Sequence, residues 1–186
     1  DSDTIVGAAV RMPLIPGGNP PTLYPYVYSG GPSGILFSTV AEGTMEAINA
    51  SGVAVGGRGT SSFTFDGTKV TRFASPGAVP LAINASGIVA GYSIGPLVPE
   101  AKAAWFEGGA TVFLDLSAVP NPTGQVLWSE ARGINSSRAI VGFVRTERNL
   151  PQDPIYGFVQ SGGQMSVIGG LGGFQTMAYA INDSGV

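Results

Sequence analysis

The chain has 186 residues, of which 44% are hydrophobic and only 11% are charged, and its net charge at pH 7 is −3. This balance excludes intrinsic disorder, which needs low hydrophobicity and high charge, and the nine Lys and Arg residues are too scattered to predict a nucleic-acid partner. The absence of cysteine and histidine excludes a disulfide framework, a thiolate nucleophile and the usual Ser-His triad, and no apolar run approaches the ~18 residues that a membrane helix needs.

A short motif recurs along the chain: Ala-Ile-Asn, a Ser-Gly turn, and an apolar run that ends in Gly. Its clear copies cover residues 47–56, 82–91 and 133–142, the third with Gly133 for the Ala and Arg138 for the turn Gly, while residues 1–7 match its second half and residues 180–186 match its first half. Recurrence at about 45 residues is typical of proteins whose units stack on one another. We therefore predict one repeat domain over residues 1–186, with repeats at 1–49, 50–84, 85–135 and 136–182 and with 183–186 beginning the next.

A second element follows each motif, a short aromatic strand before a Gly turn. Its copies lie at residues 25–31, 63–67, 104–109 and 157–163, and each is followed by another apolar run. Each period then reads as four short strands: the strand ending in Gly, the aromatic strand, the post-turn strand, and the strand ending in Ala-Ile-Asn. No apolar period of 3.6 residues runs through ten residues, so at most single turns of helix are expected, at 44–47 and 129–132.

Four short strands per period of about 45 residues are typical of a propeller blade. The predicted fold class is therefore all-β, a propeller-like array of four four-stranded repeats. A β-solenoid and an open stack of sheets are the alternatives. In the Asn-x-Ser-Gly turns, we expect the Asn side chain to bond the backbone two residues on and the Gly to adopt a positive φ. The same triplets match the N-glycosylation pattern, but we favour the structural role for this Asn.

The motif halves at residues 1–7 and 180–186 predict a joint, in which the first strand of a chain pairs with a last strand. If the chain closes on itself, the strand around Ile5 and Val6 pairs with the strand around Ala180 and Ile181, which removes an exposed sheet edge. If it does not close, the same strands pair between molecules and give head-to-tail polymers.

The repeat pattern has three features in succession: A-I-N-x-x-G-x-x-x-G, then an aromatic residue before a Gly turn, then L-G-G leading back to A-I-N. Together they resemble the bacterial extracellular HAF-repeat family. The stretch that carries the resemblance best is residues 167–182, and the resemblance extends over all four periods. The family is named for a His-Ala-Phe tripeptide, whereas this chain has no His and shows residues 61–63, 103–105 and 156–158 there. The resemblance implies an extracellular or cell-surface location and implies no reaction.

The loops between the first and second strands of each period differ in length and collect cations and aromatic residues. Loops on a rigid scaffold commonly carry function, and aromatic side chains with Arg suit a sugar or a partner protein. The candidate binding residues on this long-loop face are Arg11, Tyr24, Arg58, Tyr92, Lys102, Trp128, Arg145, Arg148 and Tyr156. The alternative is that these side chains only cover the ends of the sheets.

No catalytic, cofactor or metal site is predicted. A carboxylate pair for glycoside hydrolysis would have to come from loop acids that are ordinary surface residues: Glu100, Asp115, Glu130, Glu147 and Asp153. The turn at residues 182–185 suggests calcium only loosely, because its other copies lack the carboxylate of Asp183.

Two function classes remain, and neither is enzymatic. The first is an extracellular structural repeat protein that associates with itself, through its terminal half-repeats, into surface filaments or matrix. The second is a carbohydrate- or protein-binding module that uses the long-loop face. The partners expected are therefore the chain itself, and a carbohydrate or a surface protein.

Overall fold

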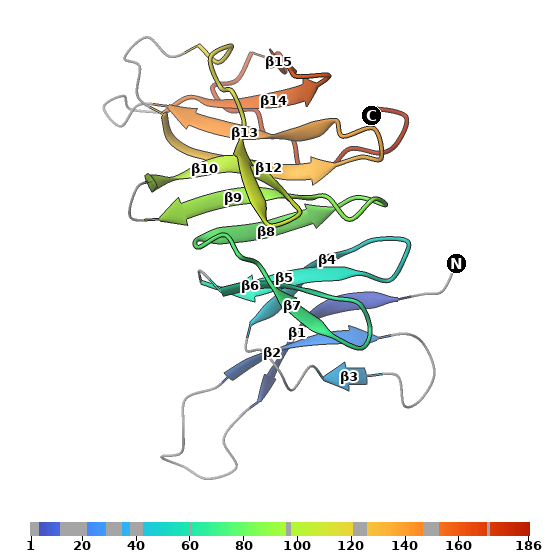
Figure 1. Cartoon of the computed structure of the whole chain (residues 1–186). Coiled ribbons are helices and arrows are strands. Elements are labelled where there is room, and N and C mark those ends of the chain that lie inside the picture. Colours follow the sequence, from blue (N-terminus) through green and yellow to red (C-terminus); the bar gives the residue numbers. More distant parts are fainter. Residues whose placement is uncertain are drawn as a thin grey trace.

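A computed structural model describes residues 4–11, 22–28, 35–37, 43–59, 61–95, 98–120, 126–146, 153–170 and 172–186. Every helix or strand within these ranges is a β-strand, so the all-β prediction is confirmed. The strands form four antiparallel sheets that lie one above another in an open stack (Figure 1). The described residues contain no helix with the length and apolarity to cross a membrane.

The sheets follow one another in chain order. The first contains β1 (Ile5–Arg11), β2 (Thr22–Tyr28) and β3 (Ile35–Phe37), in that order. The second contains β4 (Thr44–Ile48), β5 (Ala54–Arg58), β6 (Ser61–Phe65) and β7 (Val70–Arg72). The third contains β8 (Ala78–Ile83), β9 (Val89–Gly95), β10 (Val98–Glu107) and β11 (Ala110–Phe113). The fourth contains β12 (Val126–Ile134), β13 (Ile140–Thr146), β14 (Ile155–Ser161) and β15 (Gln164–Val167).

The sheets are offset by one strand from the predicted periods. The strand that ends in Ala-Ile-Asn opens the next sheet, because the tight Asn turn pairs it in a hairpin with the strand that follows. We call β4, β8 and β12 the opening strands. The first sheet shows no such strand among its described residues. The predicted helical turns at 44–47 and 129–132 are wrong, since both stretches lie within opening strands.

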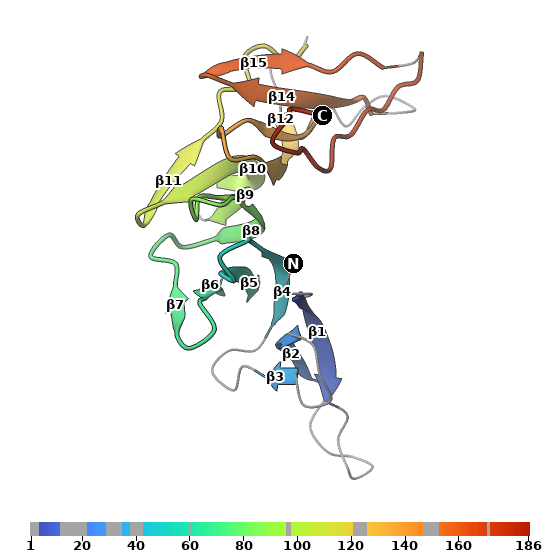
Figure 2. The same ribbon diagram turned by 90° about the vertical axis from the view of Figure 1, so that its right-hand side faces the viewer.

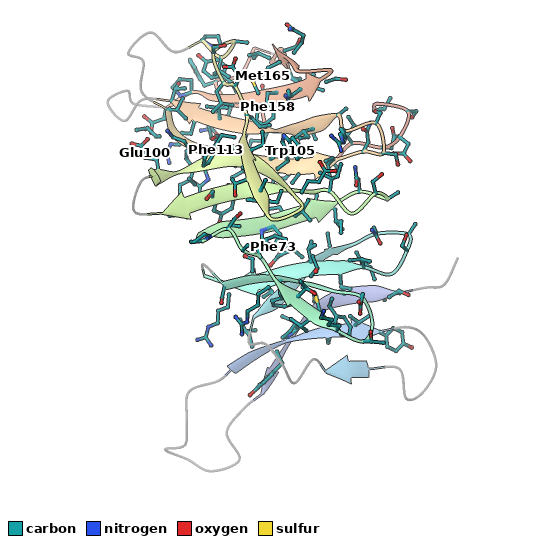
Figure 3. The ribbon with its side chains drawn as sticks, in the orientation of Figure 1. Phe73, Glu100, Trp105, Phe113, Phe158 and Met165 are labelled. Atoms are coloured by element: carbon teal, nitrogen blue, oxygen red, sulfur yellow. The ribbon has the colours of Figure 1, made fainter. Side chains whose placement is uncertain are left out.

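The largest apolar core lies between the third and fourth sheets. Its buried members are Ile88, Ala90, Ala103, Leu114, Val119, Ala131, Ile134, Ile140, Val144 and Phe158. Trp105 and Met165 are partly buried against it, and Figure 3 shows these two side chains with Phe158 in the upper half of the stack. Alternation along each strand places small residues on the opening strands and aromatic ones on the third strands, so facing sheets fill the space between them.

Two smaller cores hold the lower sheets. Val55 of the second sheet packs on Ala78, Ile83, Val89 and other side chains of the third sheet, and the rings of Phe73 and Phe106 lie 5.7 Å apart at this junction. Among the described residues, Val27 is the buried side chain of the first sheet that joins the lowest core. The stack is therefore packed most heavily at its upper end.

The stack does not close into a ring in this structure. The first and fourth sheets lie at opposite ends, and the C-terminal segment lies beside the fourth sheet (Figures 1 and 2). Residues 176–182 are in no strand, and β1 pairs with β2 alone among the described residues. The sequence prediction of ring closure or of pairing between molecules is thus still a prediction.

Candidate functional site

The four Asn turns share one local geometry. The Oδ1 atom of Asn84 accepts hydrogen bonds from the backbone N–H groups of Ser86 and Ile88, at 3.1 and 2.9 Å. Asn49 and Asn135 hold their turns in the same way. The structural role predicted for this Asn is confirmed, because its side chain satisfies backbone donors that no strand can reach.

The same Asn side chains also connect neighbouring sheets. The Nδ2 group of Asn49 donates to the carbonyl of Asn84 at 3.0 Å, and Asn84 donates to the carbonyl of Asn135 at 3.1 Å. Asn135 in turn donates to the carbonyl of Asn182 at 3.1 Å. We call this chain of bonds the asparagine ladder. It links the second, third and fourth sheets and extends beyond the fourth sheet onto the C-terminal segment.

The last turn docks on the fourth sheet through Asp183. Its carboxylate accepts from the backbone N–H of Ser136 at 2.8 Å and from the Ser136 hydroxyl at 2.9 Å. These bonds lower the pKa of Asp183 below its ordinary value, because they stabilise the ionised form. Gly133 of β12 lies under residues 180 and 181, and a Cβ built there would come within 3.1 Å of the Ala180 Cα. The absence of a side chain at Gly133 therefore allows the segment to approach β12 closely.

A bulge interrupts each opening strand at the third residue before its Asn. The pairing shifts between Met45 and Ala47 in β4, and likewise in β8 and β12. The extra residue pushes a carbonyl toward the next strand. A Cβ at Gly56 would lie 1.9 Å from the Thr44 carbonyl oxygen, so this motif Gly is required by close approach of two backbones.

The aromatic and charged side chains predicted to bind a ligand meet only in part. The ring centroids of Tyr92 and Trp128 lie 5.6 Å apart, across the junction of the third and fourth sheets. The Trp128 indole N–H donates to the buried Glu130 carboxylate at 2.6 Å, and Arg132 forms an ion pair with the same carboxylate at 2.5 Å. Arg132 also lies over the ring of Tyr179 from the C-terminal segment, at 5.7 Å. Glu130 and Arg132 are thus members of a cluster that the sequence did not assign to binding.

The surroundings of the Tyr92 phenol favour its neutral form over its ionised form. Burial raises the pKa of its phenol first, and the negative charges of Glu130 and Glu46 raise it further, while Arg132 opposes them. Tyr92 therefore stays a neutral hydrogen-bond donor over a wide pH range.

A cleft of about 340 Å³ opens beside Tyr92, between the second and third sheets. Its polar wall carries Thr44 and Glu46, whereas its apolar wall includes Val79 and Ile94. Gly57 takes the position that Tyr92 holds in the third sheet, one residue after the motif Gly, and its missing side chain leaves this space. The cleft can accept a small ligand that has a flat apolar face and hydroxyl groups.

The remaining predicted binding residues are spread over the stack. Arg145 is paired with Asp153 at 2.5 Å and lies opposite Trp128 in the fourth sheet. Lys102 and Arg58 are exposed on β10 and β5. Tyr24 and Tyr156 are half-buried in β2 and β14. Arg11 ends β1 opposite Thr22. Arg148 lies outside the described residues.

The acids considered for catalysis do not converge on one place. Glu100 lies at one side of the stack, on β10 (Figure 3), and Asp115 accepts from the backbone N–H of Ser117 at 3.0 Å. Asp153 and Glu130 are held in ion pairs, and Glu147 lies outside the described residues. Among the residues that the structure describes, no three acidic side chains are grouped so as to hold a metal ion.

No protein-family model, curated protein or solved structure matches the chain.

The sequence identified the Asn turn but not the bond from one Asn to the next. The signal was present, since the Asn recurs in four copies while the residue after it varies among Ala, Ser and Asp. A turn needs only one acceptor atom, so the strict retention of Asn, where Asp or Ser would serve a turn, already indicated a role for its N–H₂ group.

Proposed function

We propose that the chain is a non-enzymatic structural module that associates with itself, end to end, on the outside of the cell. In the finer form of this proposal, the sheets are propeller-like blades whose opening strands lie innermost, and a joint between molecules continues the array. The resemblance to the extracellular HAF-repeat family supports the location.

One observation carries the proposal: both ends of the stack have room for another unit. Asn182 receives the ladder from Asn135, but its own Nδ2 group meets no acceptor among the described residues. At the other end, β1 has no strand on its outer edge in the described part of the first sheet. An unpaired sheet edge is a template for another strand.

The two ends also expose apolar side chains. Phe174 and Tyr179 of the C-terminal segment are 70% and 59% exposed, and Ile5 of β1 is 53% exposed. Large exposed apolar side chains that gather at one place are typical of contact surfaces. Association would bury these side chains and extend the stack in one direction.

Light scattering after gel filtration, over a dilution series, tests this proposal together with negative-stain microscopy. We expect a mass that rises with concentration and particles that lengthen in one dimension. A monomer of constant mass at every concentration would overturn it.

A second candidate function is binding of a carbohydrate in the cleft beside Tyr92. The observation in its favour is the Tyr92–Trp128 pair next to a polar wall that carries Glu46. An aromatic face and a carboxylate acceptor suit the apolar face and the hydroxyl groups of a sugar ring.

A glycan array tests this second candidate. The substitution Tyr92→Ala should abolish any signal, whereas Tyr24→Ala, in the first sheet and away from the cleft, should leave it unchanged. Absence of binding to every glycan, or equal binding by both variants, would exclude the cleft as a sugar site.

A further inference from the structure

The motif glycine shows which strand the first sheet lacks. In the three complete sheets, this glycine lies against a carbonyl oxygen of the opening strand. A Cβ would come within 1.9 Å of that oxygen at Gly56 and at Gly142, and within 2.0 Å at Gly91. Real Cβ atoms do not approach this closely, so the bulged opening strand excludes every residue but Gly.

Gly7 holds the same position in β1 but has no such neighbour. The three atoms nearest to a Cβ there all belong to the Tyr26 side chain, at 3.0–3.1 Å, so no described backbone carbonyl lies as close as in the complete sheets. Its φ is not in the left-handed region, so the local backbone does not require Gly either. The first sheet thus has the recess for an opening strand without the strand.

The C-terminal segment has the features of an opening strand. Residues 176–182 end in Ala-Ile-Asn and lead into an Asn turn, as β4 and β8 do, and β12 does so with Gly133 in place of the Ala. Within the part of the chain that the structure describes, the backbone groups of residues 177–181 make no hydrogen bond to another backbone group. The bulge position, three residues before the Asn, falls on Tyr179.

The pairing in the complete sheets fixes the register of this segment on β1. Gly142 pairs with Ala131, Val141 with Gly133, and Ile140 with Ile134; β8 and β9 pair in the same register. The corresponding pairs on β1 are Gly7 with Ala178, Val6 with Ala180, and Ile5 with Ile181. The carbonyl of Met177 would then lie against Gly7.

We propose that residues 177–182 of a second copy of this chain add to the outer edge of β1 and complete the first sheet. The inference rests on the proposed self-association and names its joint. A second copy is favoured over the chain's own segment because that segment is docked on β12, at the opposite end of the stack from β1 (Figure 2). Addition between molecules needs no change in the stack, whereas closure would have to bend every junction.

Cysteine cross-linking tests the joint directly, since the chain has no cysteine of its own. One preparation carries Ile5→Cys and another carries Ile181→Cys, and the two are mixed under mild oxidation. Directly opposed residues of antiparallel strands lie about 4.5–5.5 Å apart at Cα, within the range of a disulfide. We expect a covalent dimer of Ile5→Cys with Ile181→Cys at least about ten times more abundant than either homodimer.

The matched control is Ala180→Cys mixed with Ile5→Cys, because adjacent residues of a strand point to opposite faces. It should give little cross-link. If a single chain that carries both Ile5→Cys and Ile181→Cys forms the disulfide and still migrates as a monomer, the strand comes from the same chain and the second-copy proposal is overturned.

Gly7→Ala gives an independent readout on the unlinked protein. A methyl group at this position should weaken association at least about tenfold, since it occupies the place of the Met177 carbonyl. Gly95→Ala is the control, because a Cβ at Gly95 meets nothing within 4 Å. Circular dichroism of the dilute variants should be that of the parent chain.

The outcomes separate the joint from the proposed function. If the Gly7→Ala variant still associates, and Ile5→Cys and Ile181→Cys form no cross-link, the proposed joint is overturned. The proposal that the chain associates with itself would still hold. A parent chain that never associates would overturn both.

Discussion

The fourth sheet and the first sheet are built from the same repeat, yet they are completed to different degrees. In the fourth, β12 presses its Glu130 carbonyl on Gly142, and the Asn135 turn links the third sheet to the C-terminal segment. In the first, no described carbonyl lies so close to Gly7, and Val27 is the buried side chain that joins the core among the described residues. The comparison teaches that the opening strand is what converts a three-stranded sheet into a stacking unit.

The reason is that the opening strand contributes to two interfaces. Its backbone pairs with the second strand of its own sheet, and its final Asn donates to the next sheet in the stack. A sheet without an opening strand has neither this backbone pairing nor the hydrogen bond from the Asn to the next sheet. Stability in such arrays is the sum of unit and neighbour terms, so an incomplete unit weakens its own end of the stack most.

The largest expected effect contrasts the two motif glycines. Gly142→Ala places a Cβ 1.9 Å from the Glu130 carbonyl oxygen and 2.8 Å from the Phe158 ring, so the opening strand has to move. We expect a loss of about 3–5 kcal/mol in the free energy of unfolding. Gly7→Ala should cost about 1 kcal/mol or less, because only the Tyr26 ring has to turn. Urea unfolding of dilute protein measures both, and equal losses would break the comparison.

The asparagine ladder gives the next effect. Asn84 is 4% exposed and makes three hydrogen bonds, so Asn84→Ala leaves the buried N–H of Ile88 unpaired. We expect a loss of about 2–4 kcal/mol. Asn182→Ala, at the exposed end of the ladder, should cost less than about 1 kcal/mol. Urea unfolding again provides the measurement.

Asn84→Asp isolates the bond between sheets. The carboxylate keeps the acceptor for Ser86 and Ile88 but replaces the N–H₂ donor to Asn135. Its stability should lie between those of the parent chain and Asn84→Ala. An Asp variant as stable as the parent would show that the ladder bond contributes nothing.

A smaller effect sharpens the comparison at the turns. Arg138 has a φ of 63°, at the position where the other Asn turns carry Gly. Its guanidinium lies 5.5 Å from the Trp105 ring centroid and pairs with Glu107 at 2.7 Å, contacts that offset the strain. Arg138→Gly should be more stable than Arg138→Ala by about 1 kcal/mol, since only Gly adopts this φ without steric cost. Thermal unfolding measures this difference, and equal midpoints for the two variants would contradict a strained turn.

The smallest effect depends on pH at the end of the ladder. The pKa of Asp183 is lowered from 3.8, first by the backbone N–H of Ser136 and then by its hydroxyl. The docking of the last turn is therefore complete above pH 3.8 and is lost as pH falls through the lowered pKa of the folded form. Hydrogen exchange at the Ser136 amide should accelerate in that window, relative to neighbouring amides. In Asp183→Asn the exchange should show no such step; a step in both variants would assign it to another group.

Turn chemistry made much of this fold predictable from sequence. Asn84 and Gly87 required a hairpin, and apolar runs on both sides of it indicated strands. The period of about 45 residues then indicated stacked sheets. Sequence could not assign the opening strand to its sheet, because Leu81–Ala82–Ile83 reads equally well as the end of one unit or the start of the next.

The candidate site was less predictable. Tyr92 and Trp128 were identified as aromatic residues near loops, but their contact depends on how two sheets are offset. Glu46 and Arg132 gave no signal, since they are ordinary charged residues at bulges that only the pairing reveals. The recess at Gly7 became visible only by comparison with Gly91 and Gly142 in three dimensions.

The sequence by itself determined the turns, the strands and the number of repeats, because hydrogen bonds within a few residues and alternation along a strand depend on local residue types alone. Only the tertiary structure decided which strand opens each sheet, which Asn bonds to which, and which edge is left without a partner. These depend on backbones that approach from distant parts of the chain, and a carbonyl 1.9 Å from a missing Cβ is a property of two segments together.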